Sequence, residues 1–134
     1  MQTFLPYSDF TDSVKCLDYK RLGKQRVEAM QTYNQITKGK GGYPYHPVNK
    51  MWQDYPNALA YYHNLCIDEW IARGYKNTMS YIPFDQFGYE MDMPHWLGNE
   101  QLHASHRSNL LRKDYAFYSQ YGWQEPTDMP YIWL

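Results

Sequence analysis

The stretch at residues 17–28 reads LDYKRLGKQRVE, and it places charge along one side of an expected helix. Its polar side chains recur at i, i+3, i+4 and i+7, so they leave the helix in roughly one direction: Arg21, Lys24, Gln25 and Glu28. The apolar side chains nearby are expected to face a core: Tyr19, Leu22, Val27, Met30 and Tyr33. This charged face is either a binding site or an ordinary solvated surface.

Working outward, the spacing and the turn residues predict three main helices, at residues 13–37, 54–73 and 99–113. A long connection at residues 77–98 is rich in aromatic residues and methionine but has no clean period. The residues after 113 are aromatic and contain two prolines, which indicates an irregular C-terminal tail. We therefore expect an all-α compact domain, a single unit over residues 1–134.

Composition narrows the class of protein. The chain has 15 Tyr and 5 Trp, and such rings serve cores, wet interfaces and base stacking. Its formal net charge is only −1, so any nucleic-acid site has to be local. Cys16 and Cys66 lack a paired spacing, which favours reduced, buried thiols. With no signal peptide and no apolar run of membrane length, we expect a cytoplasmic monomer without membrane contact, in the host cytoplasm if phage-encoded.

A second cationic face is expected on the helix at residues 99–113. It carries His103, His106, Arg107 and Lys113, interleaved with serines, and these side chains supply the donors that phosphate oxygens need. Two histidines one turn apart can also bind a metal, with His46 as a third nitrogen, but the spacing lacks a fixed carboxylate or cysteine. We expect phosphate binding here, and neither a metal nor a cofactor.

Two further sets of residues leave alternatives open. Glu28 is either a salt-bridged structural residue or a carboxylate held charged by Arg21, Lys24 and Arg26 for use as a general base or transition-state stabiliser. The aromatic residues of the long connection either stack on a ligand or pack together: Tyr81, Phe84, Phe87, Tyr89 and Trp96. We expect both cationic faces and the His46 loop to form one pocket.

Several motifs resemble a known family. Leu17-Asp18 followed by Leu22 and Glu28, GGYPYHP at 41–47, ALAYYHNLCIDEW at 58–70 and RGY at 73–75 are similar to the pyrimidine-dimer DNA glycosylase family typified by phage endonuclease V. The start MQTFLPYSDF, RLGKQRVE at 21–28 and the end HASHRSNLLRKD…DMPYIW resemble most closely a group of small uncharacterised phage and actinobacterial relatives of that family.

The resemblance implies a bundle of three main helices and a chemistry. An N-terminal amine attacks the anomeric carbon of a deoxyribose and forms a Schiff base, a carboxylate on the first long helix assists, and arginines grip phosphates. By position Glu28 looks like that carboxylate, Arg26 like a phosphate-gripping cation, and His46 like the histidine of the loop after the first long helix. Because Gln2 is large, Met1 should be retained, so the Met1 amine is the expected nucleophile and Lys24 the alternative.

The expected function is therefore that of a DNA glycosylase that cleaves the N-glycosidic bond of a damaged or modified base, with AP-lyase action as a further step. The alternative is a non-catalytic protein that binds a nucleotide-like ligand or a partner, such as a phage factor acting on its host. A third reading is a metal-dependent hydrolase that uses the histidines.

Overall fold

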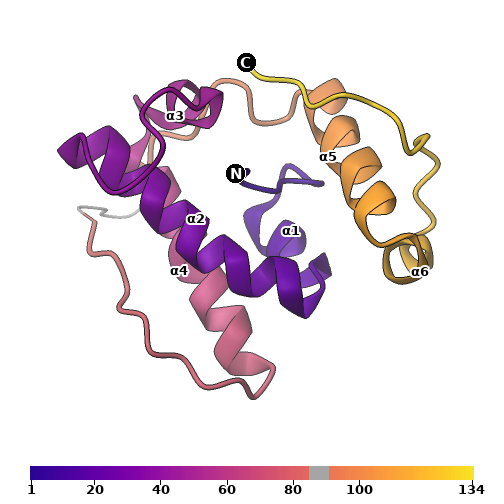
Figure 1. Ribbon diagram of the computed structural model, residues 1–134, viewed down its shortest axis with the longest axis horizontal. Helices are drawn as coiled ribbons and strands as arrows, with labels where there is room; N and C mark the ends of the chain where they lie inside the picture. The colour runs from indigo at the N-terminus through magenta and orange to yellow at the C-terminus, as the bar shows by residue number, and fades with distance from the viewer. Residues whose placement is uncertain (85–90) are drawn as a thin grey trace.

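The computed structural model describes residues 1–84 and 91–134, and over these residues it contains helices but no strands (Figure 1). The three main helices are α2 (Tyr19–Lys38), α4 (Pro56–Ala72) and α5 (Glu100–Lys113). Shorter elements complete the chain: α1 (Phe10–Cys16), α3 (Pro47–Trp52), α6 (Tyr115–Tyr118) and the 3₁₀ turn η1 (Ser119–Tyr121). The all-α class and the three main helices are confirmed. None of the helices described is long and apolar enough to cross a membrane.

The expected first helix is broken at Leu17 and Asp18, so that prediction was wrong. Both residues have extended backbones, with ψ values of 140° and 162°. In this conformation Leu17 is fully buried, and the Asp18 carboxylate accepts a hydrogen bond from the Tyr118 hydroxyl and pairs with Arg21 at 3.3 Å. These tertiary contacts outweigh the local preference for a continuous helix.

Helix α2 packs chiefly on α4, and its inward stripe consists of Leu22, Gln25, Ala29 and Thr32 (Figure 1). Two residues expected in the core are instead exposed: Val27 by 41% and Tyr19 by 53%. Val27 lies on the opposite side from this stripe, and Tyr19 belongs to the first turn, where its ring contacts Tyr75. The inward stripe includes a buried amide, Gln25, which a hydrophobic pattern alone does not predict.

Residues 2–6 are buried but belong to no helix, and they lie between α5 and the α2–α4 pair (Figure 1). Side chains of α2 and α4 pair their backbone groups. The Gln25 amide donates to the Gln2 carbonyl at 2.7 Å, and its oxygen accepts from the Phe4 N–H at 2.9 Å. The Tyr62 hydroxyl lies 2.7 Å from the Phe4 carbonyl. Burial of this segment is therefore matched by specific polar partners.

Helix α5 pairs the same segment from the other side. The Leu5 N–H donates to Nδ1 of His106 at 2.9 Å, and the Leu5 carbonyl lies 2.7 Å from Nδ1 of His103. The other nitrogen of His103, Nε2, accepts from the Gly98 N–H at 3.0 Å, so Nδ1 carries the proton and donates to Leu5. Both imidazoles are thus held as neutral side chains in the core.

The same helix also holds the C-terminal tail, which returns toward the N-terminus in Figure 1. The Met129 N–H donates to the Ser108 hydroxyl at 3.0 Å, and the Asn109 amide donates to the Met129 carbonyl at 3.0 Å. Further along, the Ile132 N–H donates to the Ser105 hydroxyl at 3.3 Å. The polar residues of α5 therefore bind backbone from both ends of the chain.

His106 is predicted to lower the free energy of unfolding at mildly acidic pH, because burial lowers the pKa of this imidazole from 6.5 to about 3. Between those values the unfolded chain binds a proton that the folded chain does not, so His106 costs stability as pH falls below 6.5, by up to about 1.4 kcal/mol per pH unit. Urea unfolding at pH 7, 6, 5 and 4 measures the slope. In His106→Gln, whose amide oxygen can accept the Leu5 bond, the slope should be shallower by that amount. Equal slopes in both proteins would contradict the assignment.

Candidate functional site

Glu28, on α2, lies beside the first residues of the chain. One of its carboxylate oxygens, Oε2, accepts from the Gln2 N–H at 3.1 Å and lies 3.4 Å from the Gln25 amide nitrogen. The terminal amine of Met1 is one residue before that N–H. Both Met1 and Glu28 line a cleft of about 180 Å³, here called the amine cleft, whose lining is completed by Gln2, Phe4, Arg21, Lys24, Gln25, Lys113 and Tyr131.

The amine cleft carries more positive than negative charge. Its described lining contains Arg21, Lys24, Lys113 and the N-terminal residue Met1, against one carboxylate, that of Glu28. Lys24 and Lys113 are exposed, whereas Arg21 forms an ion pair with the Asp18 carboxylate at 3.3 Å. Such a group of donors suits an anionic ligand, and a phosphate above all.

Gln25 fixes the chain end next to Glu28. Its side chain is 1% exposed, and its amide nitrogen contacts both the Gln2 carbonyl and the Glu28 carboxylate. The sequence placed Gln25 on the polar face with Arg21 and Glu28, but it did not indicate that Gln25 binds the chain end. A glutamine three residues before a carboxylate is common on helices, so the sequence holds no signal that would have singled it out.

His46 approaches the same chain end from the loop before α3. It lines a second hollow, of about 170 Å³, with Met1, Glu28, Gln31 and Tyr43. Nδ1 of His46 accepts from the Val48 N–H at 3.1 Å, so in the neutral ring Nε2 carries the proton and is a donor. Burial, followed by the charge of the terminal amine, lowers the pKa of His46, and Glu28 partly offsets this.

The glycines before His46 let the loop approach α2 closely. A Cβ atom at Gly42 would lie 2.6 Å from the carbonyl oxygen of Gln31, which no side chain could tolerate without a backbone shift. Gly41 has φ +90°, in the left-handed region. The glycine-rich run at residues 39–42 thus allows the close backbone contact that brings Tyr43 and His46 to the second hollow.

Apart from Lys113, the candidate residues of α5 do not line the amine cleft. His103 and His106 are 1% and 0% exposed and bind Leu5, as described above. Arg107 pairs with Glu100 and Glu125, and it donates to the Pro6 carbonyl at 2.7 Å.

The expectation of one ligand pocket shared by both cationic faces is therefore corrected. The faces of α2 and α5 meet at residues 2–6 of the protein itself, because those buried peptide groups need partners. Both ring nitrogens of His103 are engaged within the chain. Among residues 1–84 and 91–134, no group of three His, Cys, Asp or Glu is placed to hold a metal ion.

Arg26 is also placed away from the lining of the cleft. Its guanidinium lies 4.1 Å from the centre of the Trp70 ring, and it donates to the Asn77 side chain at 2.9 Å. Burial lowers its pKa. These contacts hold the start of the long connection against α2, instead of leaving Arg26 facing the amine cleft.

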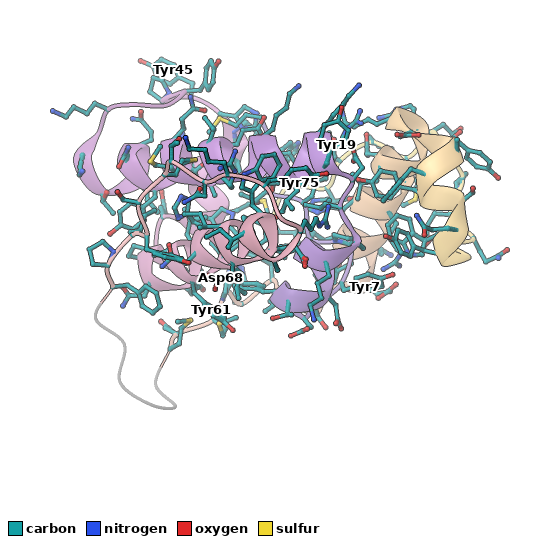
Figure 2. The ribbon with its side chains drawn as sticks, turned by 90° about the horizontal axis from the view of Figure 1, so that it is seen from below. Tyr7, Tyr19, Tyr45, Tyr61, Asp68 and Tyr75 are labelled. Atoms are coloured by element: carbon teal, nitrogen blue, oxygen red, sulfur yellow. The ribbon has the colours of Figure 1, made fainter. Side chains whose placement is uncertain are left out.

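The aromatic residues of the long connection divide into two groups. Trp96 is buried against Trp52, and its indole N–H donates to the Met51 carbonyl at 2.8 Å, so it packs in the core. The Tyr81 hydroxyl donates to the Asp68 carboxylate at 2.6 Å. Asp68 belongs to α4 and is labelled in Figure 2. The predictions for Phe87 and Tyr89 lie outside the described residues.

Comparison with known protein families gives a match over the first part of the chain. A family model described as pyrimidine dimer DNA glycosylase matches residues 1–83. The chain belongs to the pyrimidine dimer DNA glycosylase family. The family region contains α1 to α4, and with them Met1, Glu28 and His46, whereas α5 and Lys113 lie beyond it. No curated protein and no solved structure matches the chain.

The bonds of Gln25 predict a loss of stability in Gln25→Leu, because the Gln2 carbonyl and the Phe4 N–H would be left buried without partners. The free energy of unfolding should fall by about 2–6 kcal/mol, at about 1–3 kcal/mol for each orphaned group. Urea unfolding measures this loss, and hydrogen exchange at the Phe4 amide should accelerate. The control is Gln35→Leu, the same change at a half-buried position of α2. Equal stability of the two variants would show that Gln25 does not hold the segment.

Proposed function

We propose that this protein is a DNA glycosylase that cleaves the N-glycosidic bond of a damaged or modified base. The preferred substrate in this proposal is a pyrimidine dimer, and the nucleophile is the Met1 α-amine. Membership of the family supports the reaction class. The observation that carries the assignment of residues is the 3.1 Å bond between the Gln2 N–H and the Glu28 carboxylate, which holds the chain end beside an acidic group.

The proposed first step is a displacement at C1′ of the deoxyribose. The lone pair of the amine forms a bond to C1′ while the C1′–N bond breaks, and the base leaves with that electron pair and takes up a proton. Loss of a proton from the attacking nitrogen and opening of the C1′–O4′ bond give a Schiff base between the chain end and the sugar. Removal of a C2′ proton then expels the 3′-phosphate, which is the AP-lyase step.

Glu28 is proposed to act on both charge and protons. Its carboxylate lies where positive charge would develop, on the sugar as the base departs and on the iminium nitrogen afterwards. The same group can accept the proton that the amine nitrogen loses, or the C2′ proton of the lyase step. Its hydrogen bonds from Gln2 and Gln25 both involve one oxygen, Oε2, and orient the carboxylate.

The cations of the cleft are proposed to bind the DNA backbone. Arg21, Lys24 and Lys113 line it together with Met1, and each can donate to phosphate oxygens. The Nε2–H of neutral His46 adds a donor on the other side of the chain end. Arg26, His103, His106 and Arg107 are proposed to act through structure, since each is engaged with groups of the protein.

Two amines near Glu28 compete for the role of nucleophile. Lys24 lines the same cleft as Met1, but it is an exposed side chain on a flexible stem. In model compounds an α-amine loses its proton about two to three pH units below a lysine amine, so more of it is nucleophilic near neutral pH. We therefore favour Met1 and keep Lys24 as the alternative.

A non-catalytic role is the second candidate, namely binding of a nucleotide-like ligand. Two observations favour it: the formal net charge of −1 gives no long-range attraction to DNA, and the amine cleft encloses only about 180 Å³. In that case the same cations would hold a single phosphate group.

The proposed chemistry predicts that Glu28→Gln retains the fold but loses activity by about 10²-fold or more, the usual contribution of a general acid–base group. The substrate is a duplex oligonucleotide with one thymine dimer, and base release and strand cleavage are measured with melting temperature alongside. Glu69→Gln on α4 makes the same change in a carboxylate that pairs with Arg73, and it should keep full activity. Turnover at the wild-type rate by a normally folded Glu28→Gln protein would contradict a catalytic role for Glu28.

The cations of the cleft predict salt-dependent DNA binding despite the small net charge. With roughly three to five phosphate contacts, the slope of log affinity against log salt on duplex DNA should be about −3 to −4.5. Lys113→Ala should make the slope shallower by about one unit. Fluorescence anisotropy over a salt series measures both, with Lys76→Ala, an exposed lysine outside the cleft lining, as control. Weak salt dependence together with a preference for mononucleotides would favour the second candidate.

A further inference from the structure

An open groove of about 460 Å³ runs along the outer side of α2, directly beside the amine cleft. Its lining includes Tyr19, Lys20, Gly23, Val27 and Trp70, and we call it the aromatic groove. Lys24 and Glu28 line both the groove and the cleft. A strand of nucleic acid that occupies the cleft can therefore continue into the groove.

Three rings gather at this groove. The rings of Trp70 and Tyr75 are 4.5 Å apart between centroids and inclined by 35°, and those of Tyr75 and Tyr19 are 6.3 Å apart and inclined by 38°. Tyr19 is 53% exposed and Tyr75 41% exposed, and Figure 2 shows the two side chains on the same face of the molecule. Trp70 is partly buried against the core, whereas Tyr19 and Tyr75 are exposed together, which is typical of a binding surface.

The position of Trp70 is fixed by its neighbours. Arg26 lies over its ring at 4.1 Å, and its indole N–H donates to the Lys76 carbonyl at 3.0 Å. Gly23 gives the ring room, because a Cβ atom there would lie 3.2 Å from it. The stacking surface is therefore formed in the free protein, so little conformational entropy is lost when a ligand binds.

The charges of the groove select its occupant. Lys20 and Lys24 are exposed, and Glu28, on the border with the cleft, is the only acidic residue that lines the groove among those described. Aromatic rings interleaved with cations suit single-stranded nucleic acid, where bases stack on the rings and phosphates meet the cations. An apolar partner would gain nothing from the two lysines.

We propose that the aromatic groove stacks an unpaired DNA base adjacent to the nucleotide whose sugar occupies the amine cleft. This inference rests on the proposed function, because it takes the occupant of the cleft to be a nucleotide of a DNA strand. A base turned out of the duplex loses its stacking partners, and the exposed rings of Tyr19 and Tyr75 replace them, with Trp70 supporting Tyr75 from behind. The groove then selects DNA in which pairing is already weakened, as it is at a damaged base.

The test uses the full chain and a duplex with a tetrahydrofuran abasic analogue, which cannot be cleaved at a glycosidic bond, beside a 2-aminopurine. The wild-type protein should change the 2-aminopurine fluorescence on binding, as the probe leaves the helix and stacks on the rings. The double variant Tyr19→Leu/Tyr75→Leu should bind about tenfold more weakly or worse. Its salt slope should equal that of the wild type, because no cation is removed.

Two controls separate stacking from loss of structure. Tyr19→Phe keeps the ring and should bind like the wild type, and Tyr115→Leu removes a ring that is 63% exposed on α6 and should also have no effect. If the wild type and the double leucine variant show equal affinity and an equal fluorescence change, the proposal that the aromatic groove stacks a base is wrong. The proposed chemistry can fail separately. If the wild-type protein forms no covalent adduct with abasic DNA, but the double leucine variant still loses the fluorescence change, the chemistry is rejected and base stacking in the groove is supported.

Discussion

Residues 2–6 are buried without the hydrogen bonds of a helix or a sheet, and each peptide group left unpaired there would cost about 1–3 kcal/mol. Side chains from separate helices supply the missing partners. From α2, Gln25 forms hydrogen bonds with the backbone of Gln2 and Phe4. From α5, His103 and His106 form hydrogen bonds with the backbone of Leu5. The N-terminal segment thus joins α5 to the α2–α4 pair, and the arrangement of the three main helices depends on it.

This constraint also explains the location of the candidate site. Chain ends are usually poorly ordered, but here the bonds to residues 2–6 fix the backbone up to Gln2. Met1 consequently lines the same two hollows as Glu28, and His46 reaches one of them from the loop before α3. A nucleophile held in place before the substrate arrives loses less entropy in the reaction. The bonds that stabilise the fold therefore also position the proposed nucleophile.

The sequence predicted the main helices well because their signals are local. Asn99 caps α5 through its own side chain, and a helix at 99–113 was expected. The break at Asp18 was missed, since its cause is Tyr118, a residue 100 positions away. His103 and His106 were read as ligand-facing because a periodic polar face looks the same whether it meets a ligand or the protein's own backbone. The nearness of Met1 to Glu28 followed from the family resemblance, and no spacing in the sequence implies it.

The most direct test of this account is to identify the nitrogen that reacts. The full-length protein is incubated with abasic-site DNA in the presence of sodium borohydride, which reduces a Schiff base to a stable amine, and the adduct is mapped by proteolysis and mass spectrometry. The account predicts that the sugar fragment is attached to the α-nitrogen of Met1, in the peptide whose next residues are held by Gln25 and Glu28. An adduct on the side-chain nitrogen of Lys24, with the Met1 amine unmodified, would contradict it.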